Sequence, residues 1–141
     1  MIRRFRKLRR DARGAAAIEF ALVAPALIVF IVGIAQLGVL FMANAGLTHA
    51  VAEGARFATI FKRDTGTGPT DAEIRARIAD SRFGLNPANL STPTITHGTD
   101  DGANYAEISA SYDVPLDFIF FTLPPVTLTE TRRAFIQPPT T

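Results

Sequence analysis

The sequence offers few residues whose types and spacing could do chemistry. Asp64-Thr65-Gly66 matches the triplet of aspartic proteases, but that chemistry needs two facing carboxylates and the chain has no second copy, so a turn is the better interpretation. His49 and His97 stand alone, without the spacing of a metal site. The 141 residues contain no cysteine, which excludes thiol nucleophiles and zinc fingers. We therefore expect no catalysis, no metal and no cofactor.

A single carboxylate beside a long apolar stretch is more informative. Glu19 is followed by residues 20–41, which are apolar apart from Gln36, and the next charge is Glu53. About 20 helical residues, at about 1.5 Å each, cross the roughly 30 Å of a bilayer core. The stretch therefore predicts a transmembrane helix with Glu19 near one surface, where a carboxylate costs less than at the bilayer centre.

Basic residues precede this helix and set its expected topology. Residues 1–14 hold 7 of the 15 basic residues and 1 of the 13 acidic ones, which leaves a net charge of −4 on the remainder of a chain of +2. The basic block predicts a cytoplasmic N-terminus with the rest of the chain across the membrane. Because that rest is acidic, the high pI does not indicate nucleic-acid binding. The cations are Arg3, Arg4, Arg6, Lys7, Arg9, Arg10 and Arg13.

The length of the helix bears on whether it is cleaved from the protein, and its proline bears on whether it is straight. A cleaved secretory signal has a shorter apolar region, and the helical pattern continues past Phe41, so we expect the helix to be retained. Pro25 leaves the carbonyl of Ala21 without its donor and predicts a kink. The kink is either a harmless bend, which we favour, or a point that unwinds when the helix leaves lipid.

The residues around Gly14 resemble the type III signal of the type IV pilin superfamily. Gly14 is followed by four small or apolar residues, then Glu19-Phe20 and the apolar helix. With the AVAEGARFA continuation, a Thr-capped short helix and a β-rich tail, the layout resembles the TadE-like proteins, minor pilins or pseudopilins of the tight-adherence (Flp, type IVc) system. The chain is longer than the major Flp pilin and lacks the extra domain of TadG-type relatives.

The resemblance implies processing and assembly. A prepilin peptidase would cut between Gly14 and Ala15 on the cytoplasmic face, so residues 1–14 would be a leader. Glu19 would then be the fifth mature residue and would neutralise the new amine on a neighbouring subunit, while Phe20 matches the aromatic that usually follows. Such proteins help to initiate, prime or cap a pilus used in surface attachment.

The resemblance also implies partners and a location. The partners are the peptidase, the major Flp pilin, TadF- and TadG-like proteins, the inner-membrane assembly platform and the membrane itself. The location is the bacterial inner membrane, with a periplasmic C-terminal domain, or the extracellular pilus. The alternative is an uncleaved, single-pass anchor whose extracytoplasmic domain binds something unrelated to pili.

Beyond the membrane, the pattern predicts a small α+β domain over residues 64–141, into which the helix of residues 15–63 extends. A row of small residues recurs every fourth position and allows close packing, either on the chain's own strands, which we favour, or on neighbouring subunits. Glu53 and Arg56 form a solvated pair. The row is Gly46, Ala50, Gly54 and Ala58.

A short helix and three strands complete the expected domain. Thr70 and Glu73 form a capping box for a helix to about Arg82 that ends near Gly84. Its core-facing residues are Ile74, Ile78 and Phe83. The strands are expected at residues 94–97, 105–114 and 126–136, in an antiparallel sheet with a turn at Asp101-Gly102 and an apolar face of Ala106, Ile108, Ala110 and Tyr112.

An apolar run between the last two strands leaves two interpretations open. Residues 115–125 hold four contiguous apolar residues, Phe118, Ile119, Phe120 and Phe121, between bracketing prolines. They could form a core strand, or a loop that rests on the membrane or on a partner. The prolines favour the exposed, interacting loop.

Overall fold

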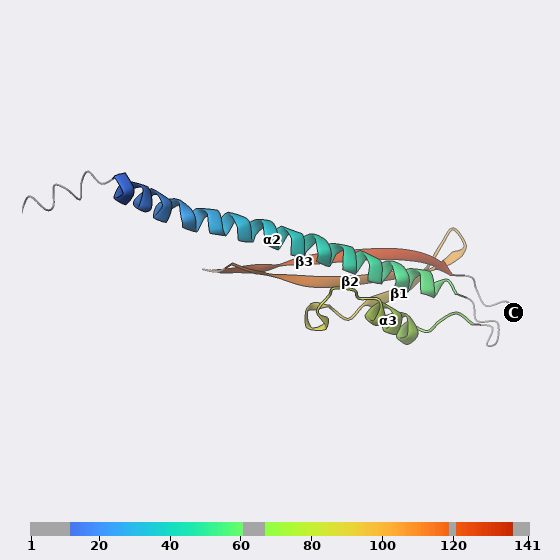
Figure 1. Ribbon diagram of the computed structural model, residues 1–141. Coiled ribbons are helices and arrows are strands. Elements are labelled where there is room, and N and C mark those ends of the chain that lie inside the picture. Colours follow the sequence, from blue (N-terminus) through green and yellow to red (C-terminus); the bar gives the residue numbers. More distant parts are fainter. Residues whose placement is uncertain (1–11, 61–66, 119–120, 137–141) are drawn as a thin grey trace, which may run out of the picture.

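The structure, a computed structural model, describes residues 12–60, 67–118 and 121–136. Figure 1 shows one long helix lying along a narrow sheet, with a short helix near the long helix's C-terminal half. The predicted α+β architecture is confirmed. The elements are α2 (Ala12–Ala58), α3 (Asp71–Asp80), the 3₁₀ turn η1 (Pro87–Asn89), β1 (Thr94–Asp100), β2 (Ala103–Asp117) and β3 (Thr122–Ile136).

Helix α2 runs without interruption for 47 residues, through Pro25. It ends at Ala58, five residues before the predicted end at Arg63, which itself lies outside the described residues. The amides of Thr59 and Ile60 donate to the carbonyls of Arg56 and Phe57, three residues back, so the last turn tightens and stops.

Helix α3 begins as predicted and ends earlier than predicted. The Thr70 hydroxyl accepts from the Glu73 amide at 3.3 Å and the Glu73 carboxylate accepts from the Thr70 amide at 2.8 Å, which completes the capping box. Ile74 and Ile78 are buried as expected. The helix is capped at Ser81 and not at Gly84.

Two residues after α3 depart from the prediction for this reason. Because the helix stops at Ser81, Phe83 leaves the helical register and its side chain is 80% exposed instead of facing the core. Gly84 adopts a positive φ of 72° in the turn that follows. The chain then returns toward α2 at Leu85, which is buried.

The sheet has three antiparallel strands in the order β1-β2-β3, as predicted. Asp101 and Gly102 form the two-residue turn between β1 and β2, and both have positive φ, the geometry that matches the twist of a hairpin. The predicted apolar face of β2 is buried, and Val114 extends it. Its opposite face carries Tyr105, Glu107, Ser109 and Ser111, none of which is buried.

The predicted loop at residues 115–125 is mostly strand, so the loop part of the preferred interpretation is wrong, whereas the expected exposure holds for Phe121, which is 45% exposed. Strand β2 continues to Asp117 and β3 begins at Thr122, so only a short turn remains. The register pairs Val114 with Val126 and Leu116 with Leu123, which places Pro115 opposite Pro124 and Pro125 in a bulge. Prolines cannot donate to a ladder, and a bulge on an edge strand is where a sheet tolerates them.

The core lies where α2 crosses the inner face of β2 and β3 and meets α3 (Figure 1). Only the part of α2 from Ala43 onward contributes fully buried side chains. The N-terminal part of the helix projects beyond the domain (Figure 1). The most deeply buried large side chains are Leu47, Val51, Ile74, Ile78, Ile108 and Val114.

Candidate functional site

The Gly14–Phe20 motif lies in the first turns of α2, at the far end from the domain. Gly14 is exposed, and a Cβ placed on it would have no heavy atom within 4 Å. Ala15 and Glu19 are exposed as well, and Phe20 is 70% exposed. The cations up to Arg10 lie outside the described residues, and α2 includes the backbone of Arg13. Each residue of the motif is thus exposed in the part of the chain that the structure describes.

Helical geometry relates the two ends of the motif. Ala15 and Glu19 are four residues apart and so lie on one face of α2. Within the bounds of α2, the first four amides have no carbonyl four residues earlier, and helix ends fray more readily than helix interiors. A protease that needs an extended backbone at Gly14 would have to open only this first turn.

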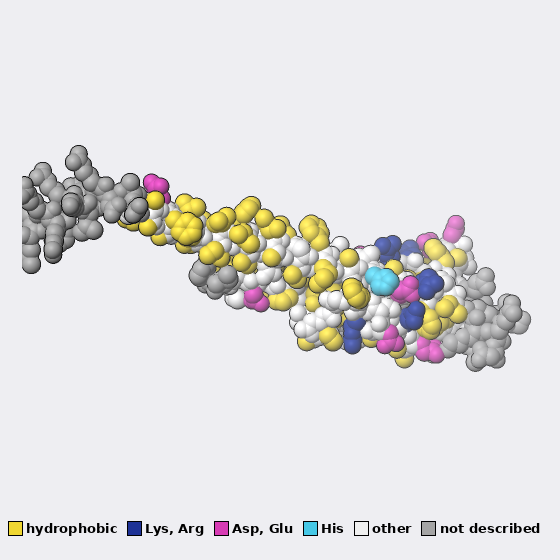
Figure 2. Space-filling view, viewed as in Figure 1, with side chains coloured by type: hydrophobic (Ala, Val, Ile, Leu, Met, Phe, Trp, Pro, Cys, Tyr) yellow, Lys and Arg dark blue, Asp and Glu magenta, His cyan; other side chains and the backbone are white. Residues whose placement is uncertain are grey.

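The apolar part of α2 is exposed over its whole length outside the domain. The helix from Gly14 to Ala58 is long and apolar enough to cross a membrane. Figure 2 shows apolar side chains along the visible face of the projecting part of α2, and we call the exposed apolar surface of this part the belt. Its large exposed side chains are Ile18, Phe20, Leu22, Val23, Leu27, Ile28, Phe30, Ile31, Ile34, Leu37, Val39, Phe41 and Met42. An exposed apolar belt of this length indicates membrane anchoring.

The row of small residues is buried inside the chain's own fold. Ala50 is fully buried and Ala58 is 4% exposed. A Cβ on Gly46 would lie 2.5 Å from the carbonyl oxygen of Phe83, and one on Gly54 would overlap Cγ1 of Ile78. The two glycines thus approach α3 and the segment after it, whereas we favoured the chain's own strands, and the burial of the row leaves it no surface for a neighbouring subunit.

Two groups of ion pairs lie on the polar surface of the domain. Glu53 accepts from Arg56 at 3.0 Å and from Arg77 of α3 at 3.3 Å. The hydrogen bond from Arg56 holds the pKa of Glu53 below its ordinary value, with Arg77 acting in the same direction and desolvation opposing both. On the sheet, Arg133 bonds Glu107 at 3.0 Å and lies 4.2 Å from the ring centre of Tyr105, and its pKa is raised, chiefly by Glu107.

The other residues that could do chemistry are not assembled into a site. The imidazole Nε2 of His97 lies 2.8 Å from the Asp71 carboxylate, in an exposed pair, and His49 is exposed. Within the described residues, no group of three His, Asp or Glu side chains could hold a metal ion. Asp64 of the Asp-Thr-Gly triplet lies outside them.

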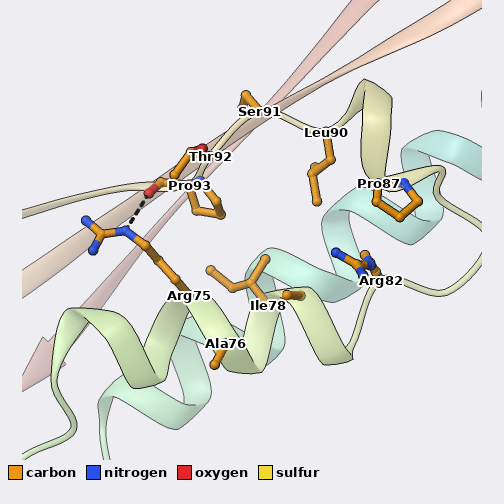
Figure 3. A pocket seen from close by; sticks show the side chains of 10 residues that line it. Arg75, Ala76, Ile78, Arg82, Pro87, Leu90, Ser91, Thr92 and Pro93 are labelled. Carbon is orange, nitrogen blue, oxygen red and sulfur yellow. Dashed lines mark hydrogen bonds between the residues drawn. The ribbon is translucent and has the colours of Figure 1, made fainter.

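A pocket of about 340 Å³ lies between α3 and the segment before β1. Figure 3 shows Ile78 and Leu90 facing each other across it, with Arg75 and Arg82 at its two ends. The Arg75 Nε donates to the carbonyl of Pro93 at 3.0 Å. No carboxylate or histidine lines the pocket, so its hydroxyl groups have no base to activate them.

Sequence reasoning missed one contact that links the domain to the apolar helix. The Gln36 side chain donates to the carbonyl of Asp117 at 2.5 Å, and the Phe118 ring lies 3.9 Å from a Cβ placed on Gly33. These partners are 81 positions or more apart, so no periodicity could pair them. The apolar run at residues 118–121 indicated that this segment makes a contact, but the sequence did not identify its partner.

Comparison with known proteins places the N-terminal part of the chain in context. The family described as TadE-like protein matches residues 14–56, from the glycine of the motif almost to the end of α2. No curated protein and no solved structure gives a significant match. The predicted resemblance to TadE-like proteins, and with it to a pilus-associated family of the tight-adherence system, is thus confirmed over residues 14–56.

Proposed function

We propose that this protein is a minor pilin, or pseudopilin, of a tight-adherence pilus, and that a prepilin peptidase cuts it between Gly14 and Ala15. The observation that carries the proposal is the family match, which begins at Gly14 and includes Glu19 and Phe20. The exposure of the motif at the free end of α2 supports it, because a peptidase could reach the bond without disturbing the domain.

The charges give the cut a physical consequence. Removal of residues 1–14 takes away 7 basic residues and 1 acidic residue, so the net charge changes from +2 to −4. The cations that hold the N-terminus in the cytoplasm are then gone. The cut also creates an amine on Ala15, and a buried amine needs an opposite charge. Glu19 supplies one, either to its own helix four residues away or, as we propose, to a neighbouring subunit.

The membrane-embedded helix and its exposed apolar belt fit a subunit that can exchange lipid for other helices. The belt extends along α2 from Ile18 to Met42, and its large side chains on the N-terminal side of Gly33 are exposed in the described part of the chain. In a filament, neighbouring pilin helices would cover this belt, with the assembly platform and the major Flp pilin as the partners. The C-terminal domain lies on the periplasmic side in this arrangement.

The processing step is tested by mapping the N-terminus of the membrane-extracted protein, made in a host with an active prepilin peptidase. We expect Ala15 at the N-terminus of the wild type and Met1 when Gly14→Ala blocks the cut. Gly38→Ala is the matched control, since Gly38 lies on the same helix and a methyl there meets nothing within 4 Å. A wild type that keeps Met1 despite an active peptidase contradicts the proposal.

The assembly step is tested separately with Glu19→Gln, which keeps the size of the side chain and removes its charge. We expect normal processing, a folded domain and a loss of pilus assembly, because the amine of Ala15 then lacks its partner. The alternative function, an uncleaved anchor unrelated to pili, predicts that neither Gly14→Ala nor Glu19→Gln has any effect on processing or assembly.

A further inference from the structure

The β2–β3 hairpin extends along α2 toward the end that carries the apolar belt. Figure 1 shows β2 and β3 reaching well past β1 and α3 in that direction. The end of the hairpin contacts α2 at two points, through the Gln36 side chain and through the Phe118 ring beside Gly33. The hairpin tip, defined here as residues 116–118 and 121–126, therefore lies beside the apolar stretch of the helix.

The position of these contacts along the helix gives the height of the tip. Glu19 and Gln36 are 17 positions apart, which is about 25 Å at about 1.5 Å per residue. If Glu19 lies at the cytoplasmic surface of the apolar layer, a hydrocarbon core of roughly 30 Å reaches a few ångströms beyond Gln36. The exposed helix residues Val39 and Phe41 agree with this, because they continue the belt past the tip. The tip is thus level with the outer edge of the hydrocarbon.

The surface of the tip suits that level. Phe121 is 45% exposed, Leu123 is 46% exposed and Val126 is 36% exposed. The Phe121 ring stacks on Phe118 with centres 4.9 Å apart, so Phe118 lies between the helix and Phe121. In water this apolar group would be costly to expose, at about 25 cal/mol per Å². The prolines in the bulge have no amide hydrogen, so each leaves one hydrogen-bond donor fewer to be satisfied outside water.

The single charge at the tip limits its depth. Asp117 is exposed, and its carbonyl accepts the bond from Gln36 while its carboxylate is directed to no partner among the described residues. A carboxylate costs about 2.5–3.5 kcal/mol at the bilayer centre and much less near the surface. The tip therefore belongs at the boundary between acyl chains and headgroups, where Asp117 can reach water.

We propose that the β2–β3 hairpin tip inserts into the outer edge of the lipid bilayer, as a second membrane contact beside the α2 span. Lipid is the occupant because the tip continues the same apolar surface as the belt and lies at the same height. The contact fixes the orientation of the domain relative to the membrane. With the α2 span alone, the whole protein could still rotate about the helix axis within the bilayer. The inference rests on α2 crossing the membrane and does not depend on cleavage or pilus assembly.

The absence of tryptophan from the sequence allows a direct test with single-tryptophan reporters. Full-length Phe121→Trp is reconstituted into phosphatidylcholine vesicles, with and without lipids that carry bromine on the acyl chain near the headgroup. We expect blue-shifted emission that loses most of its intensity with the brominated lipids. Leu123→Trp is a second reporter at the tip, for use if the first variant does not fold.

Two controls separate the tip from the span. Phe135→Trp is matched to the tip reporter, because Phe135 is 56% exposed near the other end of the same hairpin, more than about 40 Å away at about 3.3 Å per residue, and it should show no quenching. Ile28→Trp, within the apolar belt, should be quenched by bromine near the acyl chain ends.

The outcomes are distinguishable. If Ile28→Trp is quenched while both tip reporters are unquenched and emit as in water, the tip proposal is wrong and the membrane span stands. If the tip reporters emit as in an apolar environment but lipid bromine does not quench them, protein and not lipid covers the tip and the proposal is again wrong. If Ile28→Trp is not quenched, the span itself fails, and the tip proposal fails with it.

Discussion

At the residue scale, two glycines of α2 determine how closely the rest of the domain approaches. The contact at Gly46 is with a backbone atom, the Phe83 carbonyl oxygen, at 2.5 Å from where a Cβ would lie. A backbone carbonyl cannot rotate away as the end of a side chain can. The segment after α3 must therefore shift as a whole if Gly46 gains a methyl group.

Gly46→Ala is expected to destabilise the domain by about 1–3 kcal/mol, because it overpacks a well-filled contact. The matched control is Gly38→Ala, which should leave the domain's stability unchanged, since a methyl there meets nothing within 4 Å. Thermal unfolding in detergent can be followed by tyrosine fluorescence, since the chain has two tyrosines and no tryptophan. Equal midpoints for the two variants would contradict the packing argument.

A second residue-scale prediction concerns Glu53, which joins α2 to α3 through Arg77. Its pKa in the folded state is lowered from 4.5, so the folded state favours the charged carboxylate. The stabilisation is therefore fully present above about pH 4.5, the ordinary pKa, and is lost as the pH falls through the lowered value. Glu53→Gln should unfold at a lower temperature than the wild type at pH 7.

The difference between Glu53→Gln and wild type should shrink toward zero as the pH is lowered below the ordinary pKa of glutamate. It should also shrink in high salt, since the pair is exposed and screened. Melting midpoints of both proteins measured across the acidic range check this. A difference that is the same at neutral and at strongly acidic pH would mean that the side chain acts through packing and not through its charge.

At the element scale, α3 forms where the sequence predicts it, because its capping residues and its packing against α2 favour the same helix. Thr70 and Glu73 cap the helix, while Ile74 and Ile78 are buried against α2. Ten residues are too few for an isolated helix to be stable in water, so cap and packing must act together. The spacing of these four residues is legible in the sequence, and the structure confirms it.

Thr70→Ala should cost about 1 kcal/mol, which corresponds to about fivefold less hydrogen-exchange protection at the amides of α3. The Ile74 amide, which donates to the Thr70 carbonyl at 3.0 Å, is a suitable reporter. Thr70→Ser keeps the hydroxyl and serves as the control, with protection close to wild type. If both variants lose protection equally, the methyl group of Thr70 matters more than its cap.

The β2–β3 hairpin is the element for which sequence reasoning was least successful. Prolines at 115, 124 and 125 indicated a loop, because a proline in a strand removes a ladder hydrogen bond. The register shift between Val114 and Leu116 sets these prolines opposite one another, where no amide is needed. This arrangement depends on the register between the two strands, and the sequence of either strand alone does not determine that register.

At the scale of the whole molecule, the chain is divided between a lipid-compatible half and a water-compatible half. The belt on α2 ends where the buried residues of the domain begin, between Met42 and Ala43. The described charges beyond Glu19 lie on the domain side of Gly33. The hairpin tip is an exception to this division, because it is part of the domain but lies beside the apolar stretch of α2. If the tip inserts as proposed, the domain contacts the membrane at two places, through α2 and through the tip, and its orientation relative to the membrane is fixed.

The sequence by itself determined the long apolar helix, the resemblance at Gly14–Phe20, the capping box, the turn at Asp101-Gly102 and the three strands. Each of these depends on residues near one another in the chain, so composition and spacing are enough to reveal it. The early end of α3 and the exposure of Phe83 were not predictable in this way, because the chain's return to Gly46 decides them.

Only the tertiary structure decided where the small-residue row packs and what the apolar run at residues 118–121 contacts. Both depend on the approach of segments far apart in the sequence, Gly54 to Ile78 in one case and Gln36 to Asp117 in the other. A row of small side chains permits close approach but carries no information about the partner. The physical reason is that packing is a property of two surfaces, and the sequence of one surface describes only half of the contact.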